Sequence, residues 1–377
     1  MAVKSKFKFN TKERNPNHKP VDYSLVVIIL MLLCFGLVMV FSASSANAHY
    51  VYGDAMYFFK RQLLWAGFGL VVMWLVSKFP YKYIKQYTNL LFVITIFLLF
   101  VVLFAGREIN GAKRWIGVGS FTFQPSEFAK ITLVMFLAKS LTVYPKRLNQ
   151  FTTGYLRYMC IILAISGIVL LQPHMSGAVV IAVGGIAVLF AAGYKLRYFF
   201  GTLLCGIPAL IALAIGSPYR FKRITSFLDP FADKLGESWQ IVQSLYAIGS
   251  GGLFGLGLGQ SRQKFLYIPE PQNDFIFAIV CEELGFIGAV FVIFLFALLI
   301  WKGVMIAKKA PDEFSALTAI GITSLVAVQF LMNIAVVSSM MPVTGVPLPF
   351  FSYGGTSLVI LLMEMGMLLN ISRYCEK

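Results

Sequence analysis

Asp274 is the residue whose surroundings best suit acid–base chemistry. It follows the polar residues 269–273 and directly precedes a long apolar run, so its carboxylate is expected at the mouth of a membrane-spanning helix. A carboxylate at a helix N-terminus can cap free N–H groups and interact with the helix dipole. At the edge of a low-dielectric region it can instead act as a general base. The residue type alone leaves both interpretations open.

Two polar segments contain an unusual number of cations. The first holds Arg107, Lys113 and Arg114, next to Trp115. The second holds Arg220, Lys222, Arg223, Lys234, Arg262 and Lys264. Such cations either pair with lipid phosphates and nearby acids or form a site for an anionic substrate. Trp115 fits a sugar or lipid beside a phosphate, and it equally fits an aromatic anchor at the membrane interface.

Three acids fall inside apolar segments, where a charge is costly. Glu282 and Glu283 are adjacent, so their side chains leave a helix about 100° apart and face different neighbours. We expect structural pairing with a cation for at least one of them. Glu364 lies midway through the last apolar segment, and its sequence neighbours indicate no partner.

A further cluster begins at Gln124. Glu127 and Lys130 are three residues apart, which predicts an ion pair on one helix face. Gln124 or Ser126 is expected to cap that helix.

The segment 341–357 contains three prolines and three glycines among apolar residues, which excludes a regular helix. Irregular backbone at membrane depth is tolerated only where protein or a water-filled cavity surrounds it. We therefore expect this loop to line a cavity that opens outward.

Cofactor motifs are not evident. The five cysteines and three histidines show no metal-ligand spacing, and no GK[ST] follows the glycine-rich run 249–259. No metal site is predicted, although acids and a phosphorylated substrate could share a divalent cation.

The elements that position these residues are membrane helices. The chain is 58% hydrophobic and 13% charged, whereas soluble domains are about 45–50% apolar and about 25% charged. Hydropathy predicts an all-α polytopic membrane protein with ten spans near 21–43, 61–78, 82–105, 126–142, 154–171, 176–193, 197–216, 274–301, 314–339 and 354–372.

The connecting segments predict the orientation. Each of the following groups falls on the side that holds both termini: Lys78, Lys82 and Lys85; Lys139, Lys146 and Arg147; Lys195 and Arg197; Lys302, Lys308 and Lys309; Arg373 and Lys377. Short cytoplasmic loops are rich in Lys and Arg. The domain organisation is therefore a cytoplasmic tail 1–20, a ten-helix domain 21–372 and a tail 373–377. The net charge of +16 reflects this arrangement rather than nucleic-acid binding.

The longest non-spanning segment, 217–273, is predicted to be extracytoplasmic. Trp239, Val242 and Tyr246 recur at helical spacing in it, with Gln243 turned away, which predicts an amphipathic helix along the membrane surface. The cations at 107–114 and 220–264 also fall on this outer side. The preference of Lys and Arg for cytoplasmic loops does not explain them there.

The motifs resemble those of the SEDS family (shape, elongation, division and sporulation). The similar segments are NGAKRWIGVGSFTFQPSEFAKI, FLDPFAD, GESWQIVQSLYAIGSGGLFGLGLGQS, PEPQNDFIFAIVCEELGFIG and PVTGVPLPFFSYGGTSL, in order from Asn110 to Ser357. Residues 342–345 look more like the division or sporulation branch than the elongation branch. The family often has an acid in the loop between the fifth and sixth spans, where this chain has His174, so His174 is left out of the catalytic set.

The resemblance implies a glycosyltransferase that polymerises lipid II outside the plasma membrane, working at the septum with a class B penicillin-binding protein and divisome membrane proteins. It implies that Asp274 takes a proton from the acceptor's 4-hydroxyl. The pyrophosphate leaving group then needs cations, for which Lys113, Arg114, Arg223 and Lys264 are the candidates. The other expected substrate contacts are Glu127, Lys130, Trp239, Gln243 and Ser352.

Three alternatives remain. A lipid II flippase would use the intramembrane charges as a transport path. An elongation-type polymerase would share the chemistry, and a non-catalytic scaffold would hold a crosslinking enzyme without needing Asp274.

Overall fold

The chain is almost entirely helical in a computed structural model that describes residues 20–109, 112–118, 121–215, 227, 229–231, 238–265 and 267–375. The helices are α1 (Tyr23–Tyr52), α2 (Tyr57–Lys78), α3 (Tyr81–Ala105), α4 (Pro125–Val143), α5 (Arg157–Leu171), α6 (Met175–Ala191), α7 (Leu196–Ile215), α9 (Trp239–Gly251), α10 (Ile276–Lys309), α11 (Glu313–Val337) and α12 (Gly355–Ser372). Helices α1–α7 and α10–α12 lie on the segments that hydropathy predicts. The prediction of an all-α membrane fold is confirmed.

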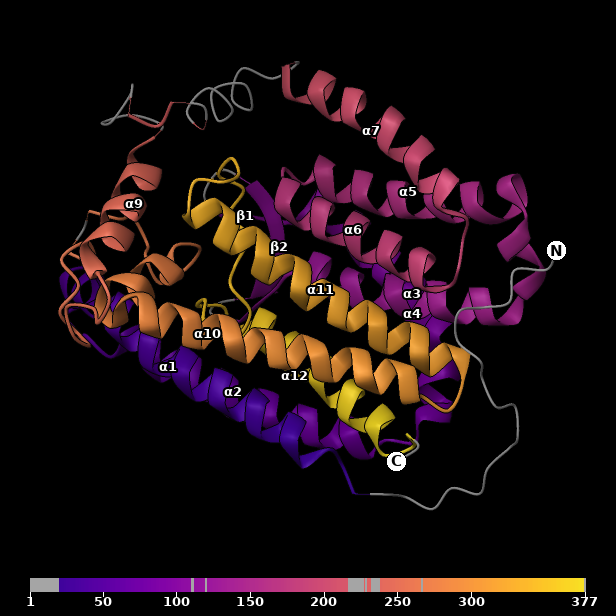
Figure 1. Cartoon of the computed structure of the whole chain (residues 1–377), viewed down its shortest axis with the longest axis horizontal. Coiled ribbons are helices and arrows are strands. Elements are labelled where there is room, and N and C mark those ends of the chain that lie inside the picture. The colour runs from indigo at the N-terminus through magenta and orange to yellow at the C-terminus, as the bar shows by residue number, and fades with distance from the viewer. Residues whose placement is uncertain are drawn as a thin grey trace.

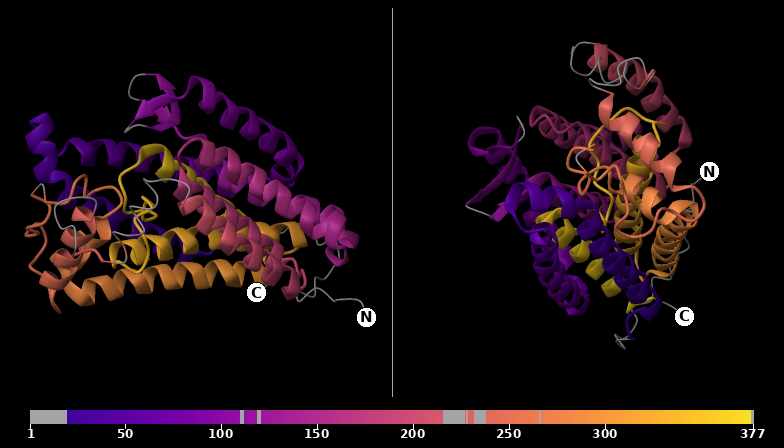
Figure 2. Two further views of the ribbon diagram at one scale, coloured as in Figure 1. Left: turned by 90° about the horizontal axis from the view of Figure 1, so that it is seen from above. Right: turned by 90° about the vertical axis from the view of Figure 1, so that its left-hand side faces the viewer.

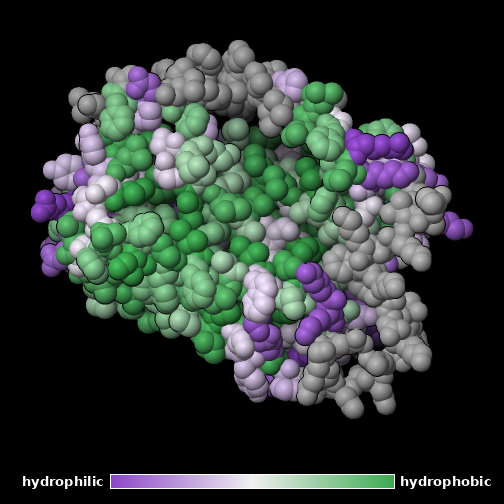
Figure 3. Space-filling view, in the orientation of Figure 1, coloured by the Kyte–Doolittle hydropathy of each residue, from purple (hydrophilic) through white to green (hydrophobic). Residues whose placement is uncertain are grey.

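Length and composition identify the spans. Within the described ranges, seven helices are long and apolar enough to cross a membrane; α5 is counted together with the π-helical turn Phe151–Leu156 that precedes it. Helix α6, of 17 residues, is shorter, and α4 contains Glu127, Lys130 and Lys139. On the face seen in Figure 3, hydrophobic residues cover the middle and hydrophilic residues gather toward the ends.

The start of α1 and the end of α12 lie at the same end of the bundle. The Asp22 backbone N–H donates a hydrogen bond to Ser372 Oγ at 3.2 Å. The Asp22 carboxylate also pairs with Lys302 Nζ, near the end of α10, at 3.1 Å. We call this the Lys302 end; the start of α10 marks the opposite, Asp274 end. The first and last helices of the domain therefore have their outer ends on the same side, as an even number of membrane crossings requires.

Helix α12 lies inside the bundle and contacts α1, α2, α4, α10 and α11. The buried apolar residues form two clusters, one mainly from α1, α2, α10 and α12 and the other mainly from α3 to α6, while α11 contributes to both. Helices α10 and α11 run side by side across the molecule, and α7 lies at the periphery (Figures 1 and 2).

A small antiparallel sheet, which the hydropathy pattern did not predict, joins α3 to α4. Its strands are β1 (Arg107–Ile109), β2 (Ala112–Val118) and β3 (Phe121–Phe123), in the order β1-β2-β3. Arg107 pairs with Trp115, and Ile116 pairs with Phe123. Because side chains alternate between the faces of a strand, Lys113 and Arg114 point to opposite sides of β2.

Helix α9 confirms the helix predicted in the long loop, but its buried face differs from the predicted one, because Gln243 is buried together with Val242. Helix α9 packs against α10 and α11. Its buried face includes Val242, Gln243 and Ser244, and Ser244 Oγ donates to the Val337 carbonyl at 2.7 Å. Tyr246, one turn after the buried Val242, is exposed. Protein neighbours, not lipid, therefore select the buried face.

Gly285 breaks α10 into two parts. Its φ of 66° and ψ of −166° are not helical. The glycine-rich run replaces the lost helical hydrogen bonds: the N–H groups of Leu256 and Gly257 donate to the carbonyls of Glu282 and Glu283, each at 2.9 Å. The carbonyl of Gly252 accepts from Phe286 N at 2.9 Å. The glycines thus allow close backbone approach at this kink.

Gly285→Ala should destabilise the protein strongly. A Cβ at this position would lie 2.3 Å from Gly255 N and 2.6 Å from the Leu253 carbonyl oxygen. The positive φ alone costs a non-glycine residue about 1–3 kcal/mol. Thermal unfolding in detergent measures the effect, with Gly167→Ala as the control because nothing lies within 4 Å of a Cβ there. Equal unfolding temperatures for the two variants would contradict the packing at the kink.

Candidate active site

A cavity of about 1320 Å³ lies between the two apolar clusters at the Asp274 end. The segment predicted from its prolines and glycines lines this cavity, with members from Gly345 to Ser357. It is not helical up to Gly354, and its last three residues begin α12. The prediction that this loop lines a cavity is confirmed. The Arg, Lys, His, Asp and Glu residues that line the cavity outside this loop are Arg61, Arg114, Glu127, Lys130, His174, Lys264, Glu270, Asp274 and Glu364.

Asp274 lines the cavity as a half-buried side chain. Asp274 does not occupy the N-cap position expected of a capping residue, because the N-cap of α10 is Phe275. Its carboxylate lies against Gly345: a Cβ built on Gly345 would stand 3.0 Å from Asp274 Oδ2. The Asp274 carbonyl accepts a hydrogen bond from Asn333 Nδ2 at 2.7 Å. The acid is therefore held by its backbone, and its side chain faces the cavity.

Ser352 secures the segment just before the acid. Its hydroxyl donates to the Asn273 carbonyl at 2.6 Å and accepts from Leu348 N–H at 2.7 Å. The N–H of Tyr353 donates to the Gln272 carbonyl at 2.8 Å. Ser352 lines the cavity as expected. Its hydroxyl, however, already makes two hydrogen bonds within the protein, to Asn273 and from Leu348.

The predicted pair between Glu127 and Lys130 is confirmed. Lys130 Nζ lies 2.8 Å from Glu127 Oε2, and both side chains are buried. Ser357 Oγ donates to the same carboxylate oxygen at 3.1 Å. Glu364 is also buried and lines the same cavity. Across the described residues, no group of three or more His, Cys, Asp or Glu side chains has an arrangement suited to a metal ion.

Neither expected cap of α4 forms. Gln124 is the N-cap, but no side chain makes the capping hydrogen bond. Instead, Gln124 Nε2 and Ser126 Oγ each lie 3.2 Å from His174 Nδ1. Pro125 at the first helical position has no N–H to cap, and the buried imidazole offers a competing partner.

His174 is a buried, neutral member of the cavity wall. Burial lowers its pKa to about 4, and the positive charge of Arg114 acts in the same direction. The imidazole is therefore uncharged near neutral pH. His174 therefore contributes no negative charge to the cavity wall.

Arg114 and Trp115 reach the cavity, whereas Lys113 does not. The guanidinium of Arg114 donates to the carbonyls of Gln172, at 3.4 Å, and Pro173. Lys113 is exposed and is absent from the cavity lining. Strand alternation in β2 explains the separation of these two neighbouring cations.

Arg61 is a cavity cation that the hydropathy pattern did not indicate. It stands in the first turns of α2, with its guanidinium 4.3 Å from the ring centre of Tyr57. Trp65 and Phe68, one and two turns further along, also line the cavity. The spacing 61, 65, 68 at the start of a span is a signal that could have revealed this face.

The remaining predicted contacts lie away from the cavity or are engaged elsewhere. Gln243 is buried in α9, and Trp239 Nε1 donates to the Tyr267 carbonyl at 2.5 Å; neither lines the cavity. Lys264 does line it, but its ammonium pairs with Glu283 at 3.0 Å. Arg223 lies outside the described residues.

Comparison with known proteins identifies close relatives. The family model for FtsW, RodA and SpoVE, described as a cell cycle protein, matches residues 23–377. Stage V sporulation protein E of Bacillus subtilis is 47% identical over 366 residues, covering 97% of this chain and 99% of that protein. A probable peptidoglycan glycosyltransferase FtsW of Trichlorobacter lovleyi is 41% identical over 353 residues, covering 93% of each chain.

A solved structure has the same fold. It belongs to a study of how a peptidoglycan synthase complex coordinates polymerization and crosslinking. The TM-score is 0.79 and the sequence identity 31%, with 94% of this chain and 99% of that chain covered.

Proposed function

The chain belongs to the FtsW, RodA and SpoVE family, and from this premise we propose that it polymerises lipid II with Asp274 as the general base. It is a peptidoglycan glycosyltransferase of the septal or sporulation type. The observation that supports the proposed chemistry best is that Asp274 faces the same cavity as Arg61 and Arg114. A base and preorganised cations in one cavity are what a glycosyl transfer from a pyrophosphate donor requires.

The proposed reaction joins two lipid II molecules in that cavity. The Asp274 carboxylate accepts the proton of the acceptor's 4-hydroxyl while that oxygen attacks the anomeric carbon of the donor sugar. The bond from this carbon to the donor's pyrophosphate oxygen breaks, and the lipid pyrophosphate leaves with the electron pair. Arg61 and Arg114 stabilise the charge that develops on the leaving group, whereas Lys130 is already paired with Glu127.

The surface of α2 suits the lipid portion of the substrate. Leu64 and Phe68 line the cavity, and both are largely exposed on the outside of the bundle. The cavity wall is thus continuous with an apolar surface. We propose that the undecaprenyl chain stays in the bilayer along α2, while the pyrophosphate lies beside Arg61.

The distribution of Lys and Arg supports the proposed side of the membrane, and similarity to a solved complex supports the proposed partner. Lys and Arg dominate the connections at the Lys302 end, which supports an extracytoplasmic Asp274 end in the plasma membrane. Similarity to the solved synthase complex supports a crosslinking partner, which we propose is a class B penicillin-binding protein. Location at the septum and contact with divisome membrane proteins are further parts of this proposal.

Polymerisation of purified lipid II by the full chain, alone and together with its crosslinking partner, tests this function. Glycan strands should appear on gels, and a crosslinking-inactive partner should still support them. Transport of lipid II across vesicle membranes without strand formation would instead favour a flippase.

Arg61→Gln and Arg114→Gln should each reduce kcat/KM for lipid II about ten- to a hundredfold, because each loses a charged hydrogen bond to phosphate. Initial rates at varied lipid II concentration measure this. The matched control is Arg147→Gln: Arg147 stacks on Tyr144 at 3.9 Å, as Arg61 does on Tyr57, but lies after α4 and outside the cavity lining. A similar loss in all three variants would remove Arg61 and Arg114 from the site.

A further inference from the structure

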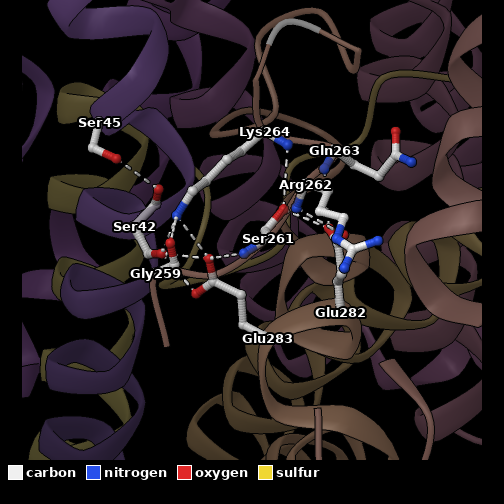
Figure 4. Close-up of polar contacts among 9 residues, drawn as sticks. All are labelled: Ser42, Ser45, Gly259, Ser261, Arg262, Gln263, Lys264, Glu282 and Glu283. Carbon is white, nitrogen blue, oxygen red and sulfur yellow. Dashed lines mark hydrogen bonds and ion pairs between the residues drawn. The ribbon is translucent and has the colours of Figure 1, made fainter. Parts of the chain in front are cut away.

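Glu282 and Glu283 hold one short loop against the kink in α10 (Figure 4). The Glu282 carboxylate accepts hydrogen bonds from Arg262 N–H at 2.9 Å, from Gln263 N–H at 3.4 Å and from the Ser261 hydroxyl. Both glutamates are at most 1% exposed. The carboxylate thus acts as a fixed acceptor for the loop backbone.

Glu283 joins the same loop to helix α1. Its carboxylate pairs with Lys264 Nζ at 3.0 Å and accepts from Ser42 Oγ at 2.6 Å (Figure 4). Lys264 Nζ also donates to the Gly259 carbonyl at 2.7 Å. We call Ser42, Lys264, Glu282 and Glu283 the clamp. Its charged groups are buried: Lys264 and Glu283 pair with each other, and Glu282 accepts hydrogen bonds from the loop, so moving any of them is costly.

The clamp sits at one end of a short helical rod that has Asp274 at its other end. Residues 276–284 are helical, and Gly285 interrupts the helix directly after them. Because of this interruption, the membrane-spanning remainder of α10 does not dictate the direction of residues 276–284. The direction of this segment is set by its own contacts: its apolar residues are buried in the core, and the clamp supplies the charged contacts at the end next to Gly285.

We propose that Glu282 and Glu283, through Lys264 and Ser42, are positioning residues that set where Asp274 stands in the cavity. This inference rests on the proposed role of Asp274. The loop held by the clamp also runs on to Asp274 itself, ten residues after Lys264. Asp274 is thus tied to the clamp by the chain on both of its sides.

A small rotation at the clamp would displace Asp274 far enough to change the reaction rate. The nine residues of the rod span about 13 Å at 1.5 Å per residue. A rotation of about 5° at the clamp therefore moves Asp274 by about 1 Å. A displacement of that size can reduce a rate about a hundredfold.

Two sets of variants test the proposal in the full chain with lipid II. Ser42→Ala removes the hydroxyl that donates to the Glu283 carboxylate and accepts from Lys264 Nζ, and Ser42 itself does not line the cavity. Ser42→Thr keeps the hydroxyl. The double variant Lys264→Met with Glu283→Gln removes the ion pair without leaving a buried charge. Its matched control is Lys302→Met with Asp22→Asn, which removes an ion pair on the other side of Gly285.

The expected result is a lower kcat with little change in KM, because the cations that hold the substrate are on other elements. Ser42→Ala should lose about tenfold and Ser42→Thr should recover most of it. The clamp double variant should lose about a hundredfold, and the Lys302 control should stay within about twofold of the wild type.

A readout independent of activity is the distance distribution between spin labels at Glu270 and Tyr23, both exposed in the described chain. It should broaden in the clamp double variant and stay narrow in the Lys302 control. Wild-type kcat and an unchanged distribution in the clamp variant would overturn the positioning role. Absence of polymerisation by the wild type would instead contradict the proposed function.

Discussion

Asp274→Asn is expected to reduce lipid II polymerisation about 10²- to 10⁴-fold, the range that a general base contributes. Asparagine has nearly the same size, so the hydrogen bond from Asn333 to the backbone of residue 274 should persist. The amide cannot accept the proton of the attacking hydroxyl. Binding of lipid II should remain, because Arg61 and Arg114 are unchanged.

The experiment compares strand formation and lipid II binding for wild type, Asp274→Asn and Asp54→Asn. Asp54 is a suitable control because it is an exposed acid in the connection between α1 and α2, paired with Lys60 and absent from the cavity lining. Unfolding temperatures establish that the variants fold equally well. Polymerisation at the wild-type rate by Asp274→Asn would refute the assigned base, and lipid II transport that persists in this variant would favour a flippase.

Lys130→Met is expected to lower the free energy of unfolding by about 3–5 kcal/mol, the cost of leaving a buried charge without its partner. Glu127 is buried, and besides Lys130 it accepts a hydrogen bond from Ser357. Glu364 lines the same cavity, so a second acid would remain near the uncompensated carboxylate. The rate of polymerisation should fall too, because the side chain of Glu127 in the cavity lining loses the ion pair that fixes its position.

Reversible unfolding in mixed detergent micelles measures the stability of Lys130→Met. The double variant with Glu127→Gln should regain most of the lost free energy, since no unpaired charge remains. Lys60→Met is the matched control: the Lys60–Asp54 pair has the same 2.8 Å distance but is exposed. Exposed pairs contribute at most about 1 kcal/mol. Equal destabilisation by Lys60→Met and Lys130→Met would show that burial does not govern the cost.

The helices and the Glu127–Lys130 pair could be predicted from the sequence because the residues that determine them are close together in the chain. A span needs only a run of apolar residues, and Glu127 contacts Lys130 because residues three apart are neighbours on a helix. The irregular loop before α12 was readable for a similar reason, since proline and glycine exclude regular helix wherever the chain goes. The identity of Asp274 as the candidate base came from family resemblance.

By itself, the sequence determined the helical membrane fold, the Glu127–Lys130 pair and the cavity-lining loop. Tertiary structure alone decided that Lys264 is committed to Glu283, that Arg61 reaches the cavity and that Lys113 does not. Ser42 and Glu283 are 241 positions apart, and Lys264 and Glu283 are 19 apart. No helical or strand period predicts a contact across such distances. Which cation pairs with a buried acid depends on packing between whole helices, because the buried charge must find its partner in three dimensions.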